Sequence, residues 1–305
     1  MKTLRNGFTL IACLVLSGQA VLAQQTRLDA GTKILIPSSA HTANFSSFLA
    51  VINLDSQPNN IRITARRTDG SVIGTPINTV INVDSKFRST DILGEMGAVS
   101  GDFGPITIES TNGKMLSAVS EVSSTQGTAG FFPGVNVQSA WMQGFIPEVI
   151  DTGEQGQAGT FRTNLGLNTI DGTAASVKVS LHDNSGGLLG SANISVAGNG
   201  MTQLRVRDSI SALGGTNGYL LIESNRPIHA WASKINNGSN DPSFEIGVGA
   251  LSGVVSQIAP PIDDYRNDLL FVILALMAPL VLALRRSQTA FSQGINQGTW
   301  ATETL

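Results

Sequence analysis

Few residues in this chain have the type and spacing that catalysis or metal binding needs. Its three histidines, His41, His182 and His229, are far apart, and none has a second His or a carboxylate at metal-ligand spacing. Serine is abundant, but no G-x-S-x-G segment supplies the nucleophile turn of a hydrolase. Cys13 is the only cysteine. The sequence therefore predicts no catalytic residues and a protein that is not an enzyme.

One loop carries the oxygen-rich side chains that Ca²⁺ prefers. Residues 236–241 read NNGSND, and Asn236 and Asp241 are the candidate ligands. The full spacing of a calcium-binding loop is missing, and an Asn- and Gly-rich turn accounts for the same residues. We therefore expect no cofactor or metal, and calcium binding is the alternative.

Trp231 is the candidate ligand-binding residue. It lies in the alternating segment 228–235, IHAWASKI, and the corresponding position earlier in the chain is Ala118. A Trp in a strand can stack on a sugar ring if it is exposed, or it can pack in a core or between domains. Packing is the favoured interpretation, and burial of Trp231 would argue against a sugar site.

The central part of the chain repeats itself. Residues 45–74 align without gaps on residues 161–190, at an offset of 116 (161 minus 45), and GPITIES at 104–110 matches GYLLIES at 218–224. The identical pairs of the first alignment include Phe45/Phe161, Leu49/Leu165, Asp55/Asp171, Gly70/Gly186 and Gly74/Gly190. Two copies of about 110 residues are therefore predicted, as modules at 27–139 and 140–258.

Within each copy, apolar residues alternate with a period of two, which indicates β-strands. Ile61, Ile63 and Ala65 alternate with polar neighbours, whereas the strand at 48–54 is apolar on both faces and is expected to be more buried. Short strands and recurring Asp-Gly turns predict an all-β fold of two tandem antiparallel β-sandwiches. One helical turn per copy is expected, at 91–96 and 208–213, each opened by an Asp suited to N-capping.

The pattern of these copies resembles known surface modules. A strand of the form F-x-x-x-L, a polar turn, a second alternating strand and then Gly is similar to the immunoglobulin-like or fibronectin-like sandwiches that occur in tandem on bacterial surface proteins. The Cys and core Trp of antibody-type domains are absent. The resemblance implies an adhesive or structural role and assigns no functional residue.

The N-terminal segment has the features of an export signal. In residues 1–23, basic residues precede an apolar core, and small residues lead to Ala23. This pattern is typical of a secretory signal peptide cleaved after Ala23. Lipidation at Cys13 is an alternative, but the apolar run before it is short. Cleavage would remove Cys13 and leave the mature chain without a thiol.

The C-terminal segment predicts a membrane anchor. Residues 269–284 carry no charge over 16 positions, and Arg285 and Arg286 follow. A helix of about 24 Å nearly spans the hydrocarbon core of a bilayer, and the Arg pair places the 285–305 tail in the cytoplasm. A buried core helix is the alternative. Together with the linker at 259–268, this order resembles the tripartite sorting signals of bacterial surface proteins.

Charge excludes one class of partner. The net charge is −3 and the sequence pI is about 5.6, so the basic surface that nucleic-acid binding needs is not expected. The predicted function is that of a non-enzymatic, single-pass membrane protein, with its ectodomain in the periplasm or on the cell surface and a structural, adhesive or scaffolding role. The membrane is the predicted partner through residues 269–284, together with an unidentified surface protein or glycan. A carbohydrate- or calcium-dependent binding module in the second copy is the alternative.

Overall fold

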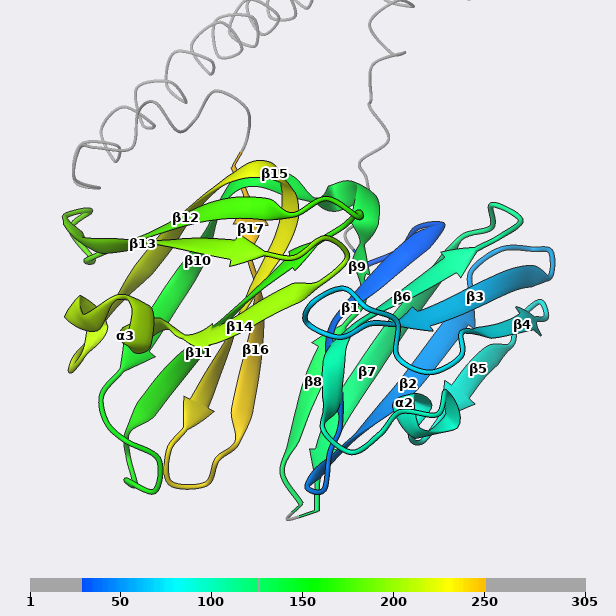
Figure 1. Ribbon diagram of the computed structural model, residues 1–305, viewed down its shortest axis with the longest axis horizontal. Coiled ribbons are helices and arrows are strands. Elements are labelled where there is room, and N and C mark those ends of the chain that lie inside the picture. The colour runs from blue at the N-terminus through cyan, green and yellow to red at the C-terminus, as the bar shows by residue number, and fades with distance from the viewer. Residues whose placement is uncertain (1–28, 126, 251–305) are drawn as a thin grey trace, which may run out of the picture. The chain divides into compact units, whose positions relative to one another are not determined.

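The fold is described for residues 29–125 and 127–250 of a computed structural model of the chain (Figure 1). These residues form antiparallel sheets, and the helices among them are single turns. The predicted all-β class is therefore confirmed.

The first half of the described chain contains two sheets. Their strand orders are β4-β3-β6-β1-β9 and β5-β2-β7-β8. The strands are β1 (Lys33–His41), β2 (Phe45–Asn53), β3 (Asn59–Ala65), β4 (Ile77–Ile81), β5 (Lys86–Ser89), β6 (Asp102–Ser110), β7 (Leu116–Ser124), β8 (Ala129–Pro133) and β9 (Val135–Asn136). Both sheets contribute to one hydrophobic core, with Ile36 and Ile63 from the first and Leu49 and Leu116 from the second.

The second half repeats this strand order. Its strands are β10 (Trp141–Asp151), β11 (Phe161–Thr169), β12 (Ala175–His182), β13 (Leu188–Val196), β14 (Met201–Arg205), β15 (Thr216–Asn236), β16 (Pro242–Ile246) and β17 (Val248–Gly249). One layer is β13-β12-β15-β10-β17, and the other is β14-β11-β15-β16. The long β15 belongs to both layers, because its first part pairs with β12 and its second part, from Ile228, pairs with β11. Apart from this shared strand, the pairing matches that of the first half.

Alternation along the strands explains which side chains form the cores. Ile61, Ile63 and Ala65 are buried, as their period-two pattern predicts. The strand that begins at Phe45 is less buried than expected, because Ile52 is 45% exposed and Leu54 is 44% exposed. Only one face of this antiparallel sheet is covered by the core, and these two residues lie on the other.

The two predicted helical turns differ in how they begin. Helix α2 (Ile92–Glu95) is N-capped by Asp91, whose carboxylate accepts a hydrogen bond from the Gly94 amide, as predicted. Helix α3 (Val206–Ser209) has Arg205 at its N-cap without a side-chain cap, and Asp208 lies inside the helix. The expected Asp208 cap is therefore wrong, because β14 continues directly into the helix. A 3-10 turn, η2 (Ser211–Leu213), follows it, and another, η1 (Val137–Ser139), precedes β10.

The predicted signal peptide at 1–23, linker at 259–268, membrane helix at 269–284 and tail at 285–305 lie outside the described residues. Over the stretches 29–125 and 127–250, none of the helices has the length and apolar character needed to cross a bilayer.

Candidate functional site

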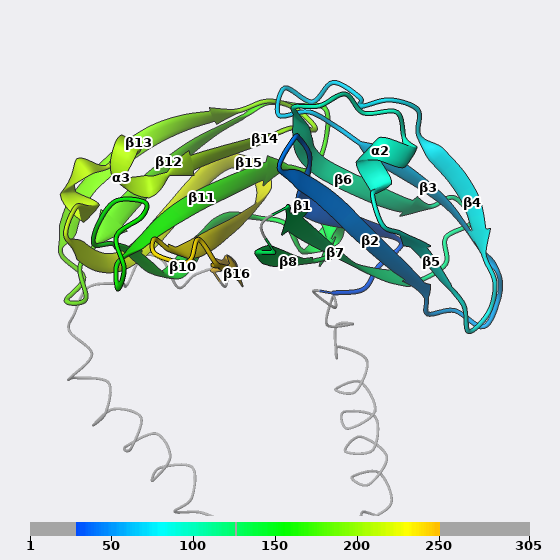
Figure 2. The ribbon, with the colours of Figure 1, turned by 90° about the horizontal axis from the view of Figure 1, so that it is seen from below.

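The face of β11 that points away from its own core contributes to the candidate site. Leu165 and Leu167 enter the core of the second sandwich, so Asn164 and Asn168 project from the opposite face. On this side of the second sandwich, β16 lies beside β8 of the first (Figure 2). The outer face of the β14-β11-β15-β16 layer is therefore where the two sandwiches meet.

Buried hydrogen bonds join the sandwiches at this seam. Trp231 Nε1 donates to Asn168 Oδ1 at 2.9 Å, and Asn168 Nδ2 donates to the Pro37 carbonyl at 2.9 Å. A backbone bond runs from the Met201 amide to the Thr68 carbonyl at 3.2 Å. Buried polar groups are costly when unpaired, so these bonds fix one relative orientation of the two sandwiches.

Trp231 is a packing residue of this seam. Its side chain is 1% exposed, and its ring lies edge to face with Phe132 of the first sandwich at 5.5 Å between centroids. Phe244 covers it at 5.6 Å, and a Cβ on Gly166, its cross-strand neighbour, would collide with the indole. The ring therefore offers no face to a sugar, and the interpretation of Trp231 as packing between modules fits the structure.

Protein donors occupy three side-chain oxygens of the 236–241 loop, those of Asn236, Asn237 and Asn240. Arg162 donates from Nη1 to Asn237 Oδ1 and from Nη2 to Asn240 Oδ1, both at 2.7 Å. Asn236 Oδ1 accepts from the backbone amides of the following turn, and Asp241 is exposed at the loop edge. A guanidinium cation thus lies against the amide oxygens of Asn237 and Asn240, where it would repel Ca²⁺. Among residues 29–125 and 127–250, there is no group of three or more His, Cys, Asp or Glu placed to hold a metal.

The three histidines lie in separate places. His41 Nδ1 is 3.1 Å from the Asp91 carboxylate, and the His182 ring stacks on Tyr219 at 5.2 Å. His229 is buried, its Nε2 has no hydrogen-bond partner within the described part of the chain, and burial lowers its pKa to about 4. The structure does not bring these imidazoles together.

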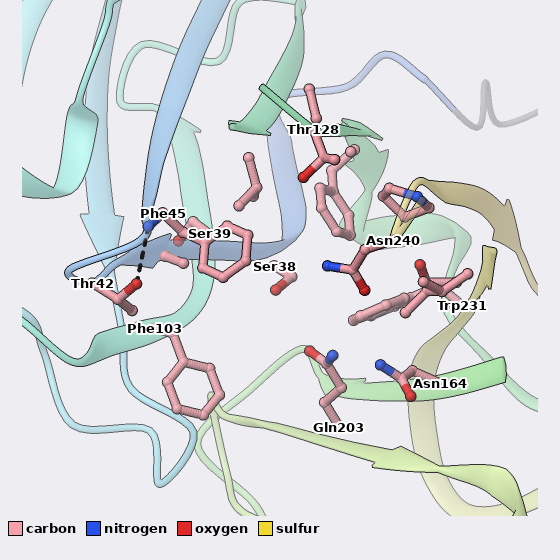
Figure 3. A pocket seen from close by; sticks show the side chains of 18 of the residues that line it. Ser38, Ser39, Thr42, Phe45, Phe103, Thr128, Asn164, Gln203, Trp231 and Asn240 are labelled. Atoms are coloured by element: carbon pink, nitrogen blue, oxygen red, sulfur yellow. Dashed lines mark hydrogen bonds between the residues drawn. The ribbon is translucent and has the colours of Figure 1, made fainter. Parts of the chain in front are cut away.

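Beside the aromatic seam, a cleft of about 550 Å³ opens between the sandwiches (Figure 3). The second sandwich contributes amide and guanidinium side chains from β11 and β14, including Asn164, Gln203 and Arg162. The first sandwich contributes the aromatic rings of Phe45 and Phe103. Figure 3 shows the amides of Asn164 and Gln203 directed into the same space as these rings. Pockets of this size and mixed lining accommodate small ligands.

Two arginines give the cleft its charge. Arg205 forms a paired contact with buried Asp151, from Nε at 2.6 Å and Nη2 at 2.8 Å, and it also contacts Glu154. These hydrogen bonds raise the pKa of Arg205, and those from Arg205 and Arg207 lower the pKa of Glu154 to about 2. Arg162 has no carboxylate within 4 Å among the described residues, and burial and the charge of Arg205 lower its pKa. The charge of Arg162 is therefore not neutralised by an ion pair.

Sequence reasoning missed this cleft, although the repeat contains a signal for it. The outward positions Arg162 and Asn164 of the second copy correspond to Ser46 and Phe48 of the first, at the offset of 116. The outward face of this strand thus carries Ser and Phe in the first copy and guanidinium and amide side chains in the second, which marks a surface with a different role.

Comparisons with known proteins place the chain in no family. No family model matches it, and neither does any curated protein. Among solved structures, a Thermotoga maritima protein is 17% identical, with a TM-score of 0.32, over 36% of this chain and 96% of its own. The Anabaena sensory rhodopsin transducer is 19% identical, with a TM-score of 0.24, over 29% of this chain and 92% of its own. At these TM-scores the matches indicate no function for the chain.

Proposed function

We propose that this chain is a non-enzymatic, membrane-anchored protein of the periplasm or cell surface. Its two immunoglobulin-like or fibronectin-like sandwiches arise by duplication and act as one rigid unit in an adhesive, structural or scaffolding role. The export and the anchor are inferred from residues 1–23 and 269–284. The observation that carries the rigid-unit role is the buried chain of hydrogen bonds from Trp231 through Asn168 to the Pro37 carbonyl.

A fixed relative orientation of the two sandwiches supports a role in adhesion or scaffolding. Modules joined by a flexible linker adopt many relative orientations, whereas a buried and hydrogen-bonded seam favours one. A glycine at position 130 strengthens this argument, because a Cβ there would lie 3.0 Å from Pro242 Cγ of the other sandwich. A fixed two-module unit holds the outer surfaces of its two sandwiches at a constant distance from each other, which suits adhesion and scaffolding.

The polar groups of the cleft support binding rather than catalysis. Among the described residues, the side chains that line the cleft are apolar or carry amide, hydroxyl or guanidinium groups. Efficient general acid–base catalysis near neutral pH uses imidazole, carboxylate or similarly tuned groups, and this lining includes neither imidazole nor carboxylate.

Cysteine labelling tests the proposed topology, because the mature chain would contain no native thiol. Ser85→Cys places a thiol at an exposed position of the first sandwich, and Thr304→Cys places one in the predicted tail. We expect a membrane-impermeant maleimide to label Ser85→Cys in intact spheroplasts and Thr304→Cys only after permeabilisation. Labelling of Thr304→Cys in intact spheroplasts, or protection of Ser85→Cys, would contradict the topology.

A further inference from the structure

The cleft between the sandwiches contains polar groups that the protein leaves without partners. Ser38 is 8% exposed and Ser233 is 7% exposed, and both line the cleft. Among the described residues, neither hydroxyl forms a hydrogen bond, and the same holds for the side-chain amides of Asn164 and Gln203. Neither hydroxyl oxygen is among the buried atoms without a partner, so both are accessible from the cleft. They are therefore free to form hydrogen bonds with a polar ligand that enters it.

The register of the sheet explains why these groups converge. Asn164 pairs with Ser233 across β11 and β15, and with Arg205 across β11 and β14. Gln203 is two residues from Arg205, so it lies on the same face of the sheet. Neighbouring strands thus place hydroxyl, amide and guanidinium groups side by side, on one rigid surface facing the first sandwich.

The charge of the cleft favours an acidic ligand. Arg162 uses two of its five N–H donors on the amide oxygens of Asn237 and Asn240, which leaves three for other partners. Its charge has no ion-pair partner among the described residues, and the described lining contains no Asp or Glu. A planar guanidinium with free donors matches the geometry of carboxylates and phosphates.

The opposite side of the cleft offers aromatic surface. Phe45 is 37% exposed and Phe103 is 43% exposed, and both rings face the cleft (Figure 3). Exposed rings opposite hydrogen-bonding groups suit a ligand that is apolar on one face and polar at its edge. A sugar ring has this form, with C–H groups on its face and hydroxyls at its rim.

We propose that the inter-sandwich cleft binds an acidic sugar, with its carboxylate on Arg162, its hydroxyls on Asn164, Gln203, Ser38 and Ser233, and its ring against Phe45 and Phe103. This site goes beyond the anchoring and mechanical role, and it depends on neither export nor the membrane span. It also differs from a sugar site on Trp231, because that indole is buried in the seam.

Calorimetric titration of the detergent-solubilised full chain tests this site. The probe is trigalacturonate, and the comparison ligands are maltotriose, which has no carboxylate, and N-acetylphenylalaninate, which mimics a peptide C-terminus. We expect trigalacturonate to bind at least tenfold more tightly than either comparison ligand. Equal affinity for maltotriose, tighter binding of N-acetylphenylalaninate, or no binding of trigalacturonate would each overturn the proposal.

Two substitutions with matched controls locate the binding. Gln203→Ala and Phe103→Ala should each weaken trigalacturonate binding about tenfold, because each removes one contact to the ligand. Gln138→Ala and Phe131→Ala change exposed residues of the same types outside the cleft, and they should alter the affinity less than twofold. Because all four side chains are at least partly exposed, the variants should keep the wild-type melting temperature. Equal losses in cleft and control variants would overturn the assignment.

Discussion

Replacing Trp231 with alanine should strongly destabilise the joined sandwiches. The side chain is 1% exposed and packs between Phe132 and Phe244. Emptying a buried Trp site costs about 3–5 kcal/mol, and the Asn168 Oδ1 atom would lose its donor, which adds about 1 kcal/mol. At about 2–4 °C per kcal/mol for a protein of this size, the melting temperature should fall by about 8–24 °C.

A second substitution tests the packing geometry itself. Gly166 lies directly across from Trp231, and a Cβ at this position would overlap the indole. Gly166→Ala should therefore destabilise the wild-type protein by about 1–3 kcal/mol, as overpacking does. In the Trp231→Ala background the space is free, so the same change should be nearly neutral. The two substitutions should thus couple by at least about 1 kcal/mol.

Urea denaturation of the four proteins of this cycle, followed by far-UV circular dichroism, measures the coupling. Gly172→Ala is the control, because its added Cβ meets only the end of the Asn199 side chain at 3.3 Å. It should change stability equally in both backgrounds. Additive effects of Gly166→Ala and Trp231→Ala, within about 0.5 kcal/mol, would refute the packing of the indole against this glycine.

Three further predictions concern single side chains. Burial lowers the pKa of His229 to about 4, below its ordinary value of about 6.5, so as the pH falls the unfolded chain binds the proton first. Stability should therefore be full above about pH 6.5 and fall by up to about 3 kcal/mol between pH 6.5 and 4. Denaturation across this range should show a smaller loss in a His229→Gln variant, and an unchanged loss would contradict the assignment. Asp241→Ala should leave the melting temperature unchanged with or without added Ca²⁺, whereas a calcium-dependent rise that this variant abolishes would restore the loop as a metal site. Asp91→Ala should lower the free energy of unfolding by about 1 kcal/mol, because it removes the N-cap of α2, and urea denaturation measures this change. Asp208→Ala should lower the free energy of unfolding by less than about 0.5 kcal/mol, because Asp208 does not cap α3. Equal losses in the two variants would contradict the difference in capping.

Local pattern was enough to predict the strands and one cap. The alternation of Ile61, Ile63 and Ala65 follows from the period of a half-covered strand, and Asp91 caps α2 through a contact three residues away. Such features depend on residues that are close in sequence, so they can be predicted from the sequence alone. The exposure of Ile52 was not predictable in this way, because it depends on which sheet face another layer covers.

The candidate site depends on contacts between distant parts of the chain. Arg162 reaches Asn237 across 75 residues, and this contact occupies the loop that composition alone suggested for calcium. The bond from Asn168 to the Pro37 carbonyl spans 131 residues. No local pattern encodes such pairings, so the cleft became evident only from the fold. The change from Phe48 to Asn164 at equivalent positions of the repeat was the one sequence signal for it.

Export and anchoring are tested most directly by the intact mass of the protein extracted from the membrane fraction of cells that express the full gene. We expect one species with the mass of residues 24–305, which is the mass of the proposed state in which the signal is removed after Ala23 and the segment at 269–284 is retained. Recovery of this species only from the soluble fraction, the mass of an uncleaved chain, or the mass of a chain that ends before residue 269 would contradict the proposed anchored state.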